Sequence, residues 1–191
     1  AGQAPETPDF VLHTTRDGRL LLFHGNRILD LSVVENLAPF GTFDELEAGR
    51  AVPGWVTLDT QDEAQCSLTV ERSSPRTYLR IESLTEETSS FCGTPFLKVK
   101  EAPFCLLAVC GKSEGAKLVA GWRWYDQNER ELFSHNLFDQ VLVSDWLWQT
   151  TCMERPKNGV YIRAVVGITE AKGAALFDTV LVIPLSRPEN A

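Results

Sequence analysis

The chain has 191 residues, of which 43% are hydrophobic and 23% are charged, and its formal net charge at pH 7 is −8. These fractions are typical of a globular chain of one domain with room for an appendage, and no apolar run approaches the roughly 20 residues that a membrane-spanning helix requires. The acidic balance and the scattered basic residues argue against nucleic-acid binding, which needs clustered Lys and Arg, and against adsorption to an anionic membrane.

The first 35 residues predict an N-terminal extension. Residues 1–9 (AGQAPETPD) are small, Pro-rich and acidic, and they lack the apolar segment of a signal peptide. Two apolar runs in residues 10–23 flank Arg-Asp-Gly-Arg, which is a strong signal for a β-hairpin. Residues 27–34 (RILDLSVV) predict a further strand. We therefore expect hairpin-like strands in residues 1–35, ahead of a main domain.

The rest of the chain consists of short alternating or apolar stretches with turn residues between them, which predicts many short strands. We expect strands at residues 55–59, 65–71, 76–82, 96–99, 104–110, 117–126, 131–135, 147–153, 159–168 and 174–183. Between them, residues 83–94 predict a polar loop, and residues 140–147 have the composition for one or two helical turns. Such a series with almost no helix is typical of an all-β sandwich or barrel.

Five cysteines, an odd number, leave at least one thiol free or paired between chains. Cys66 alternates with apolar neighbours and is expected to be a buried thiol. Cys105 and Cys110 are separated by an odd number of residues on one expected strand, so they face opposite sides and do not pair with each other. Cys92 is within reach of one of them, so a disulfide and free thiols both stay open. No C-x-x-C pair occurs, which disfavours a zinc site.

Residues 36–55 read NLAPFGTFDELEAGRAVPGW, and this pattern is similar to the opening of the jelly-roll carbohydrate-binding modules attached to xylanases and cellulases. Residues 122–132 (WRWYDQNEREL) resemble the central strand and turn of that superfamily, and residues 148–180 resemble its closing strands. The resemblance covers about residues 36–183. It implies an all-β fold, a jelly-roll β-sandwich over residues 36–186, with an N-terminal extension at 1–35 and a tail at 187–191.

The resemblance also implies a structural calcium ion as cofactor. In the superfamily, the acid that follows an inward-packing aromatic helps to bind calcium, which prefers six to eight oxygen ligands. The contributors here would be the Thr42 carbonyl, Asp44 or Glu45, and Asp178. The chain departs from the family pattern at two places. Thr179 follows Asp178 where a second acid is common, which disfavours the calcium site. Asn-Glu replaces a turn glycine at 128–129, which implies a different turn. In the alternative interpretation, these acids are solvated or cap a turn.

A candidate ligand-binding face follows from the alternation of the strands. Each tyrosine lies on the polar side of its strand, two residues from an arginine, and this spacing places both side chains on one face. The three pairs are Tyr78 with Arg80, Arg123 with Tyr125, and Tyr161 with Arg163. Trp146, in the loop sequence SDWLW, is the tryptophan most expected to be exposed, and the other four fit the core. If the strands share a sheet, these side chains form a face able to bind a neutral or acidic glycan. A protein interface or an inert surface has the same composition.

Catalytic motifs are not evident in the sequence: it contains no nucleophile elbow, no singled-out pair of carboxylates and no glycine-rich phosphate loop. The sequence therefore predicts a protein that is not an enzyme. We expect a non-catalytic, extracytoplasmic (periplasmic, secreted or cell-surface) binding module whose partner is a glycan. The alternative is a structural or accessory subunit that uses the sandwich to dock a protein in a larger surface or membrane-associated assembly. Exposure of residues 96–99 or 104–110 would favour that alternative.

Overall fold

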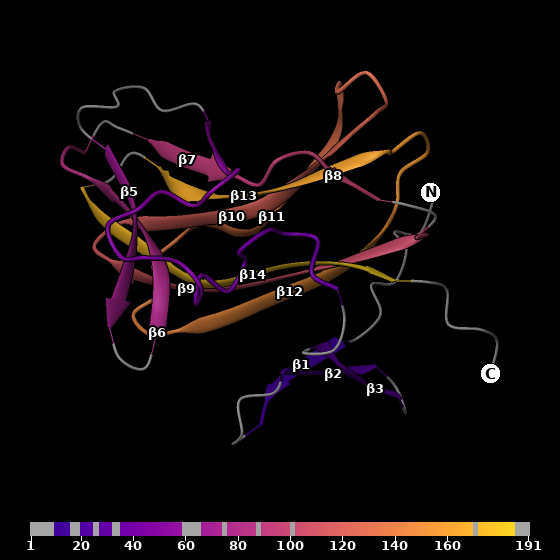
Figure 1. Cartoon of the computed structure of the whole chain (residues 1–191), viewed down its shortest axis with the longest axis horizontal. Helices are drawn as coiled ribbons and strands as arrows, with labels where there is room; N and C mark the ends of the chain where they lie inside the picture. The colour runs from indigo at the N-terminus through magenta and orange to yellow at the C-terminus, as the bar shows by residue number, and fades with distance from the viewer. Residues whose placement is uncertain are drawn as a thin grey trace, which may run out of the picture.

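The computed structural model describes residues 10–15, 20–24, 27–31, 35–58, 66–73, 76–86, 89–99, 102–169 and 172–185. Two large antiparallel sheets stack face to face, and a small three-stranded sheet lies beside one of them (Figure 1). This architecture confirms the expected β-sandwich. In the described part of the chain, no helix is long and apolar enough to cross a membrane.

Each sheet combines strands from distant parts of the sequence. The small sheet has the order β1-β2-β3, with β1 at Phe10–Thr14, β2 at Leu20–His24 and β3 at Arg27–Asp30. The six-stranded sheet has the order β11-β10-β13-β7-β4, with β8 also paired to β13; its strands are β4 (Val56–Leu58), β7 (Ser90–Gly93), β8 (Leu97–Lys98), β10 (Lys117–Tyr125), β11 (Glu131–Val141) and β13 (Tyr161–Thr169). The five-stranded sheet has the order β12-β9-β14-β6-β5; its strands are β5 (Cys66–Ser73), β6 (Arg76–Ser83), β9 (Phe104–Glu114), β12 (Leu147–Glu154) and β14 (Gly173–Leu185).

Two local expectations are wrong. β7 forms at Ser90–Gly93, inside the stretch expected to be a polar loop, because it pairs with both β13 and β4. The stretch expected to hold a helical turn at residues 140–147 is extended or bent instead. β11 continues to Val141 because it pairs with β10 along its length, with irregularities in the register. In both places, pairing with a neighbouring strand decides the structure.

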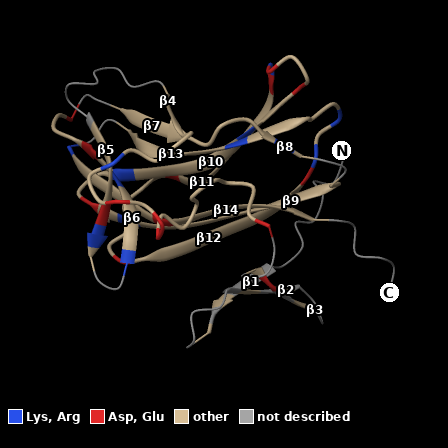
Figure 2. Ribbon diagram, viewed as in Figure 1, with Lys and Arg blue, Asp and Glu red and all other residues tan. Residues whose placement is uncertain are grey.

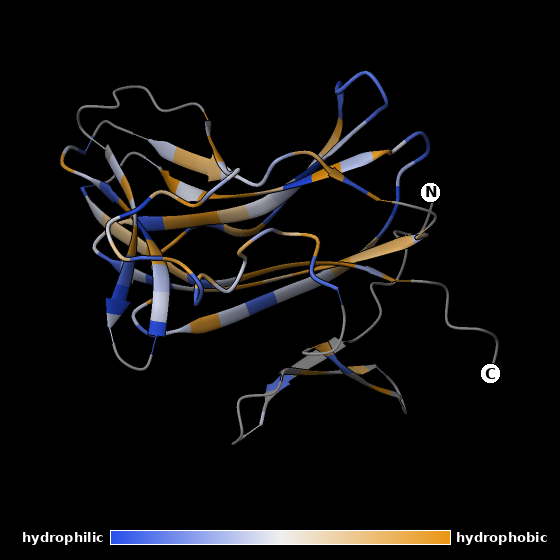
Figure 3. Cartoon of the chain, viewed as in Figure 1, coloured by the Kyte–Doolittle hydropathy of each residue, from blue (hydrophilic) through white to orange (hydrophobic). Residues whose placement is uncertain are grey.

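The core lies between the two large sheets and follows from the alternation of apolar residues. Trp122 and Trp124 of β10 point inward and are almost completely buried, as are Leu107 of β9 and Phe177 of β14. Figure 3 shows the apolar stretches along β9 and β10. Burying a large apolar side chain contributes about 1.5–3 kcal/mol. The prediction that these two tryptophans belong to the core is therefore confirmed.

A second apolar cluster lies on the outer side of the five-stranded sheet. Leu106 and Ala108 of β9, Leu181 and Ile183 of β14, and Leu31 after β3 are all buried there. The small N-terminal sheet lies beside β12 on this side (Figure 1). The N-terminal segment thus contributes to covering an apolar sheet surface. β9, expected to suit a docking surface if exposed, is buried on both faces through Cys110.

The described cysteines are free thiols in the interior. Cys92, Cys105, Cys110 and Cys152 are all buried, and none forms a disulfide. Burial raises the pKa of the Cys110 thiol to about 12 and that of the Cys152 thiol to about 11. They therefore behave as small apolar side chains. The side chain of Cys66 lies outside the described residues.

The start of the main domain is fastened to its last strand. The Asn36 side chain donates a hydrogen bond to the Val180 carbonyl (3.1 Å) and accepts hydrogen bonds from the backbone of Val182 (2.8 Å) and Ala38 (3.1 Å). The Gly41 carbonyl accepts a hydrogen bond from the Val180 amide (2.7 Å). A Cβ at Gly41 would lie 2.2 Å from the Val180 oxygen, so glycine is required for this approach.

Replacing Asn36 tests how much its hydrogen bonds contribute to the stability of the fold. We expect Asn36→Ala to lower the free energy of unfolding by about 2 kcal/mol or more, because three hydrogen bonds are lost and their backbone partners are left part-buried. The measurement is chemical denaturation followed by fluorescence. The control is Asn128→Ala, at an exposed turn position, which should change stability by about 0.5 kcal/mol or less. An equal loss of stability in both variants would contradict the conclusion that the Asn36 hydrogen bonds stabilise the fold.

Candidate functional site

Two of the three expected Tyr/Arg pairs meet on the outer face of the six-stranded sheet. In the antiparallel register of β10 and β13, Arg123 lies directly opposite Arg163, and Tyr125 lies directly opposite Tyr161. We call these four residues the Tyr/Arg square. Its members point outward because the alternating residues of the same strands, among them Trp124, fill the core. The expectation that these two pairs share one face is therefore confirmed.

Phe96, in the segment that joins β7 to β8, packs against the square. Its ring centroid lies 4.9 Å from that of Tyr125 and 5.9 Å from that of Tyr161, and the Arg163 guanidinium lies 4.0 Å from the Phe96 centroid. Phe96 is not among the residues predicted to bind a ligand, because residues 96–99 (FLKV) are expected only as one of the strands. The signal was present, since the inward residues Leu97 and Val99 alternate with it.

The members of the square differ in exposure. Tyr125 is only 8% exposed. Burial raises the pKa of its hydroxyl, while the charges of Arg123 and Arg163 and a hydrogen bond from Arg123 oppose this shift. Tyr161 and Arg163 are half-buried and reach the surface. Tyr125 therefore supports its neighbours, whereas the Tyr161 ring and the Arg163 guanidinium can contact a ligand.

A hollow of about 180 Å³ adjoins the square on the same sheet. Gly121 lines it, and a Cβ there would lie 2.2 Å from the His135 carbonyl oxygen, so glycine allows β11 to approach. Its polar lining comes from Arg123, Asn136, Asp139, Gln140 and Thr169. Of these, only Arg123 is among the residues predicted from the sequence to bind a ligand. Arg123 belongs to both the square and the hollow, so the two form one continuous site.

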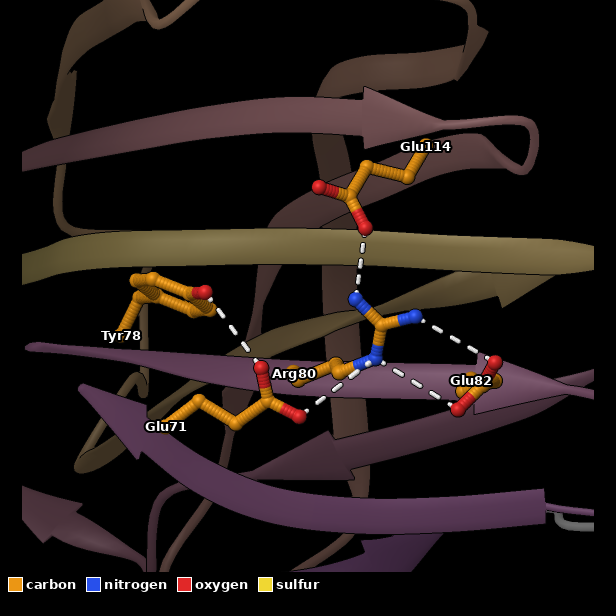
Figure 4. A network of polar contacts seen from close by, with 5 residues as sticks. All are labelled: Glu71, Tyr78, Arg80, Glu82 and Glu114. Atoms are coloured by element: carbon orange, nitrogen blue, oxygen red, sulfur yellow. Dashed lines mark hydrogen bonds and ion pairs between the residues drawn. The ribbon is translucent and has the colours of Figure 1, made fainter. Parts of the chain in front are cut away.

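The third Tyr/Arg pair lies on the opposite, five-stranded sheet. There Arg80 contacts three carboxylates, with nitrogen–oxygen distances of 2.6 Å to Glu114, 3.3 Å to Glu82 and 3.7 Å to Glu71 (Figure 4). The Tyr78 hydroxyl donates a hydrogen bond to Glu71 (3.3 Å). Figure 2 shows the charged residues gathered on β5 and β6. These contacts neutralise Arg80, so the pair has a clear structural role.

Trp146 belongs with this second group. Its ring lies 5.8 Å from that of Tyr78, and the Arg76 guanidinium lies 4.9 Å from its centroid. Trp146 is therefore separated from the Tyr/Arg square by the thickness of the sandwich. The seven residues expected to bind a ligand fall on two opposite faces, and their role in binding stays a prediction.

The residues expected to hold calcium do come from segments that meet, but their arrangement fits calcium poorly. Thr42, Asp44 and Glu45 are exposed, and Phe43 between them packs inward as the resemblance implies. Asp178 instead forms an ion pair with Arg76 at 2.5 Å. Among the described residues, no three acids, histidines or cysteines gather as metal ligands. Calcium binding therefore stays a prediction from the resemblance.

The Arg76 charge affects the pKa of the Asp178 carboxyl. Burial raises the pKa of the Asp178 carboxyl, the Arg76 charge opposes this shift, and the Asp44 charge adds to it. The Asp178 side chain is only 17% exposed. A cationic side chain thus lies against the carboxylate that the resemblance assigned to calcium. It stabilises the ionised form of the Asp178 carboxyl.

Comparisons with solved structures identify the fold. The chain is similar to the tailspike protein 4 enzymatically active domain of bacteriophage CBA120 (11% identity, TM-score 0.64), covering 78% of this chain and 21% of that one. It is also similar to the CBM22-1 xylan-binding domain of Paenibacillus barcinonensis Xyn10C (13% identity, TM-score 0.52; 80% and 96% covered). A third is TmCBM61 in complex with β-1,4-galactotriose (15% identity, TM-score 0.52; 79% and 99% covered).

These similarities establish the jelly-roll fold of carbohydrate-binding modules and confirm the resemblance seen in the sequence. The chain spans only about a fifth of the length of the tailspike domain but nearly the whole of the two binding modules. No protein-family model matches the sequence, and no curated protein matches it.

The Arg76–Asp178 pair generates a test of the calcium prediction. We expect EDTA or millimolar calcium to change the melting temperature by less than about 1 °C, because Arg76 already pairs with the buried carboxylate. We expect Arg76→Gln to lower the free energy of unfolding by about 1–2 kcal/mol at pH 7, because Asp178 is left charged and unpaired. This loss should shrink as the pH falls, because protonation of Asp178 removes the unpaired charge, and burial raises the pKa of this carboxyl.

Thermal melts and denaturant titrations at neutral pH and at a series of lower pH values provide the measurements. Arg50→Gln is the control, since Arg50 is an exposed arginine that pairs weakly with Glu47 at 3.7 Å. A melting temperature that falls in EDTA and returns with calcium would instead establish a calcium site.

Proposed function

We propose that this chain is a non-catalytic glycan-binding module and that its site is the outer face of the six-stranded sheet. The observation that carries the proposal is the Tyr/Arg square, packed against Phe96 and continuous with a polar hollow. Sugars bind proteins through their C–H faces, which contact aromatic rings, and through their hydroxyls, which pair with polar side chains. The half-buried Tyr161 ring offers the first contact, and Arg123, Asn136 and Asp139 offer the second.

The similar structures support this class of ligand. One is named as a xylan-binding domain, and another contains β-1,4-galactotriose. The aligned part of this chain covers each of these two binding modules almost completely, so the similarity extends over a whole module in both cases. We extend to this chain the general property that they have in common, which is binding to a carbohydrate.

A non-catalytic role agrees with the chemistry of the hollow. Hydrolysis of a glycosidic bond normally uses two carboxyl groups on opposite sides of the bond. Among the described lining residues, Asp139 is the one acid, and the Asn136 amide donates a hydrogen bond to it at 3.2 Å. This arrangement suits the binding of a hydroxyl group. Because glycan polymers are encountered outside the cytoplasm, we also propose an extracytoplasmic location.

The rival proposal of a protein-docking subunit has less support. It relied on exposure of residues 96–99 or of the apolar strand β9. Phe96 is packed among the rings of the square, and the outer side chains of β9, Leu106 and Ala108, are buried in a cluster with Leu31. The surfaces that would have favoured docking are thus largely covered.

Variants of one tyrosine on each face test the proposal. The purified chain is screened on a glycan array that includes xylan and β-1,4-galactan oligosaccharides, and the affinity for each hit is measured by calorimetry. We expect Tyr161→Ala to weaken binding about tenfold or more, because the half-buried ring that would contact the sugar is lost. The matched control is Tyr78→Ala, a half-buried tyrosine on the opposite sheet, which should leave the affinity unchanged.

Melting curves confirm that both tyrosine variants are folded. A loss of binding in Tyr78→Ala with full binding in Tyr161→Ala would place the site on the five-stranded sheet. An array without hits, together with a stoichiometric protein partner from the native source, would overturn the glycan proposal.

A further inference from the structure

We propose that the Tyr/Arg square selects glycans that carry a carboxylate, and that Arg163 binds the carboxylate of a hexuronic acid residue. This inference rests on the proposed function and names the ligand class for the same site. Four observations carry it: a pair of opposed arginines, the missing partner of one of them, its fixed position over an aromatic ring, and the local excess of positive charge.

The first observation is that two like charges face each other across neighbouring strands. Arg123 and Arg163 are direct partners in the register of β10 and β13. Residues directly opposite each other have Cβ atoms about 4.5–5.5 Å apart, and like charges at such positions destabilise a sheet. A chain with a net charge of −8 has many acids that could stand opposite an arginine. A cost of this kind is expected at a functional site.

The second observation is that only one of these arginines is compensated. Arg123 lies 3.9 Å from the Glu131 carboxylate. Arg163 has no ion pair or hydrogen bond with any residue that the structure describes, and its Nε is buried without an acceptor. A cation without a partner carries an uncompensated charge, which an anion bound to the guanidinium would neutralise. Arg163 is therefore the cation available to a ligand.

The third observation is that Arg163 is held in place before any ligand arrives. Its guanidinium stacks on Phe96 at 4.0 Å and lies 6.0 Å from the Tyr125 centroid. Its aliphatic stem crosses Gly93, where a Cβ would lie 3.2 Å from the Arg163 Cδ. A stacked guanidinium keeps its nitrogen fork free for planar acceptors, and a carboxylate matches that fork with two parallel hydrogen bonds.

The fourth observation is the charge around the square. Lys98 of β8 is exposed and lies opposite Tyr161 in the register, so Lys98, Arg123 and Arg163 all lie beside the two tyrosines, and Glu131 pairs with Arg123. Arg80 on the opposite sheet differs from Arg163, because three glutamates neutralise its charge (Figure 4). A pyranose ring placed on Tyr161 would direct a ring carboxylate toward Arg163, two residues along the same strand.

The experiment compares each uronic acid oligosaccharide with its own neutral methyl ester. The probes are oligogalacturonate, oligomannuronate and oligoglucuronate, each with its methyl ester, and a sulfated galactan oligosaccharide. Calorimetry measures binding to the wild-type chain, Arg163→Gln, Arg163→Lys and Arg50→Gln. We expect at least one free acid to bind about tenfold or more tightly than its ester, since hydrogen bonds between charged groups are the strong ones.

We expect this preference to disappear in Arg163→Gln, to fall in Arg163→Lys, which keeps the charge but loses the fork, and to persist in Arg50→Gln. Arg50 is exposed, so its replacement makes the same change in net charge away from the site. Melting curves provide a second readout. Removing one of two opposed like charges should leave the melting temperature of Arg163→Gln equal to or above that of the wild type.

The outcomes separate this inference from the proposed function. Equal affinity for acid and ester, with binding lost in Tyr161→Ala, would overturn the uronic acid inference and leave the glycan module standing. Binding to the sulfated probe alone would overturn the carboxylate assignment. Binding to none of the probes, combined with an array without hits, would overturn both proposals.

Discussion

The alternation of side chains along β10 and β13 is the constraint on which both the core and the candidate site depend. Trp122 and Trp124 fill the space between the sheets, and this burial forces Arg123 and Tyr125 to the outer face. A shift of the register by one residue would exchange the two sets and expose the tryptophans, so the core fixes the register. The geometry of the Tyr/Arg square is therefore stabilised by apolar packing on the other side of the same strands.

The two faces of the sandwich use charged residues in different ways. On the five-stranded sheet, Arg80 and Arg76 pair with carboxylates, and their contacts connect β5, β6, β9 and β14. Arg76 pairs with the Asp178 carboxylate that the resemblance assigned to calcium. On the six-stranded sheet, Arg163 contacts aromatic rings instead of acids. The first face is internally compensated, and the second leaves a cation that a ligand can neutralise.

The sequence allowed the fold class and half of the site to be predicted, because both follow from short-range alternation. Spacing of two residues placed each tyrosine with its arginine, and this local inference holds for every pair. It could not reveal that β6 belongs to the other sheet, since strand order depends on contacts between segments far apart in sequence. For the same reason the sequence predicts a loop where β7 forms. The hollow beside Gly121 is lined by residues of β7, β10, β11 and β13, so it could not be predicted from any one segment.

Phe96 and the opposed arginines show what the structure adds to these local patterns. Phe96 alternates with the inward Leu97 and Val99, but only the structure shows that it contacts Tyr125, Tyr161 and Arg163 at once. Arg123 and Arg163 became partners only when β10 and β13 were paired, and their repulsion then stands out against an acidic chain. Sequences usually satisfy local rules where stability alone matters and break them where binding requires it. The one place in the described sandwich where two arginines oppose each other in register is also where an aromatic surface and a polar hollow meet, and a bound anion would offset the repulsion between these arginines.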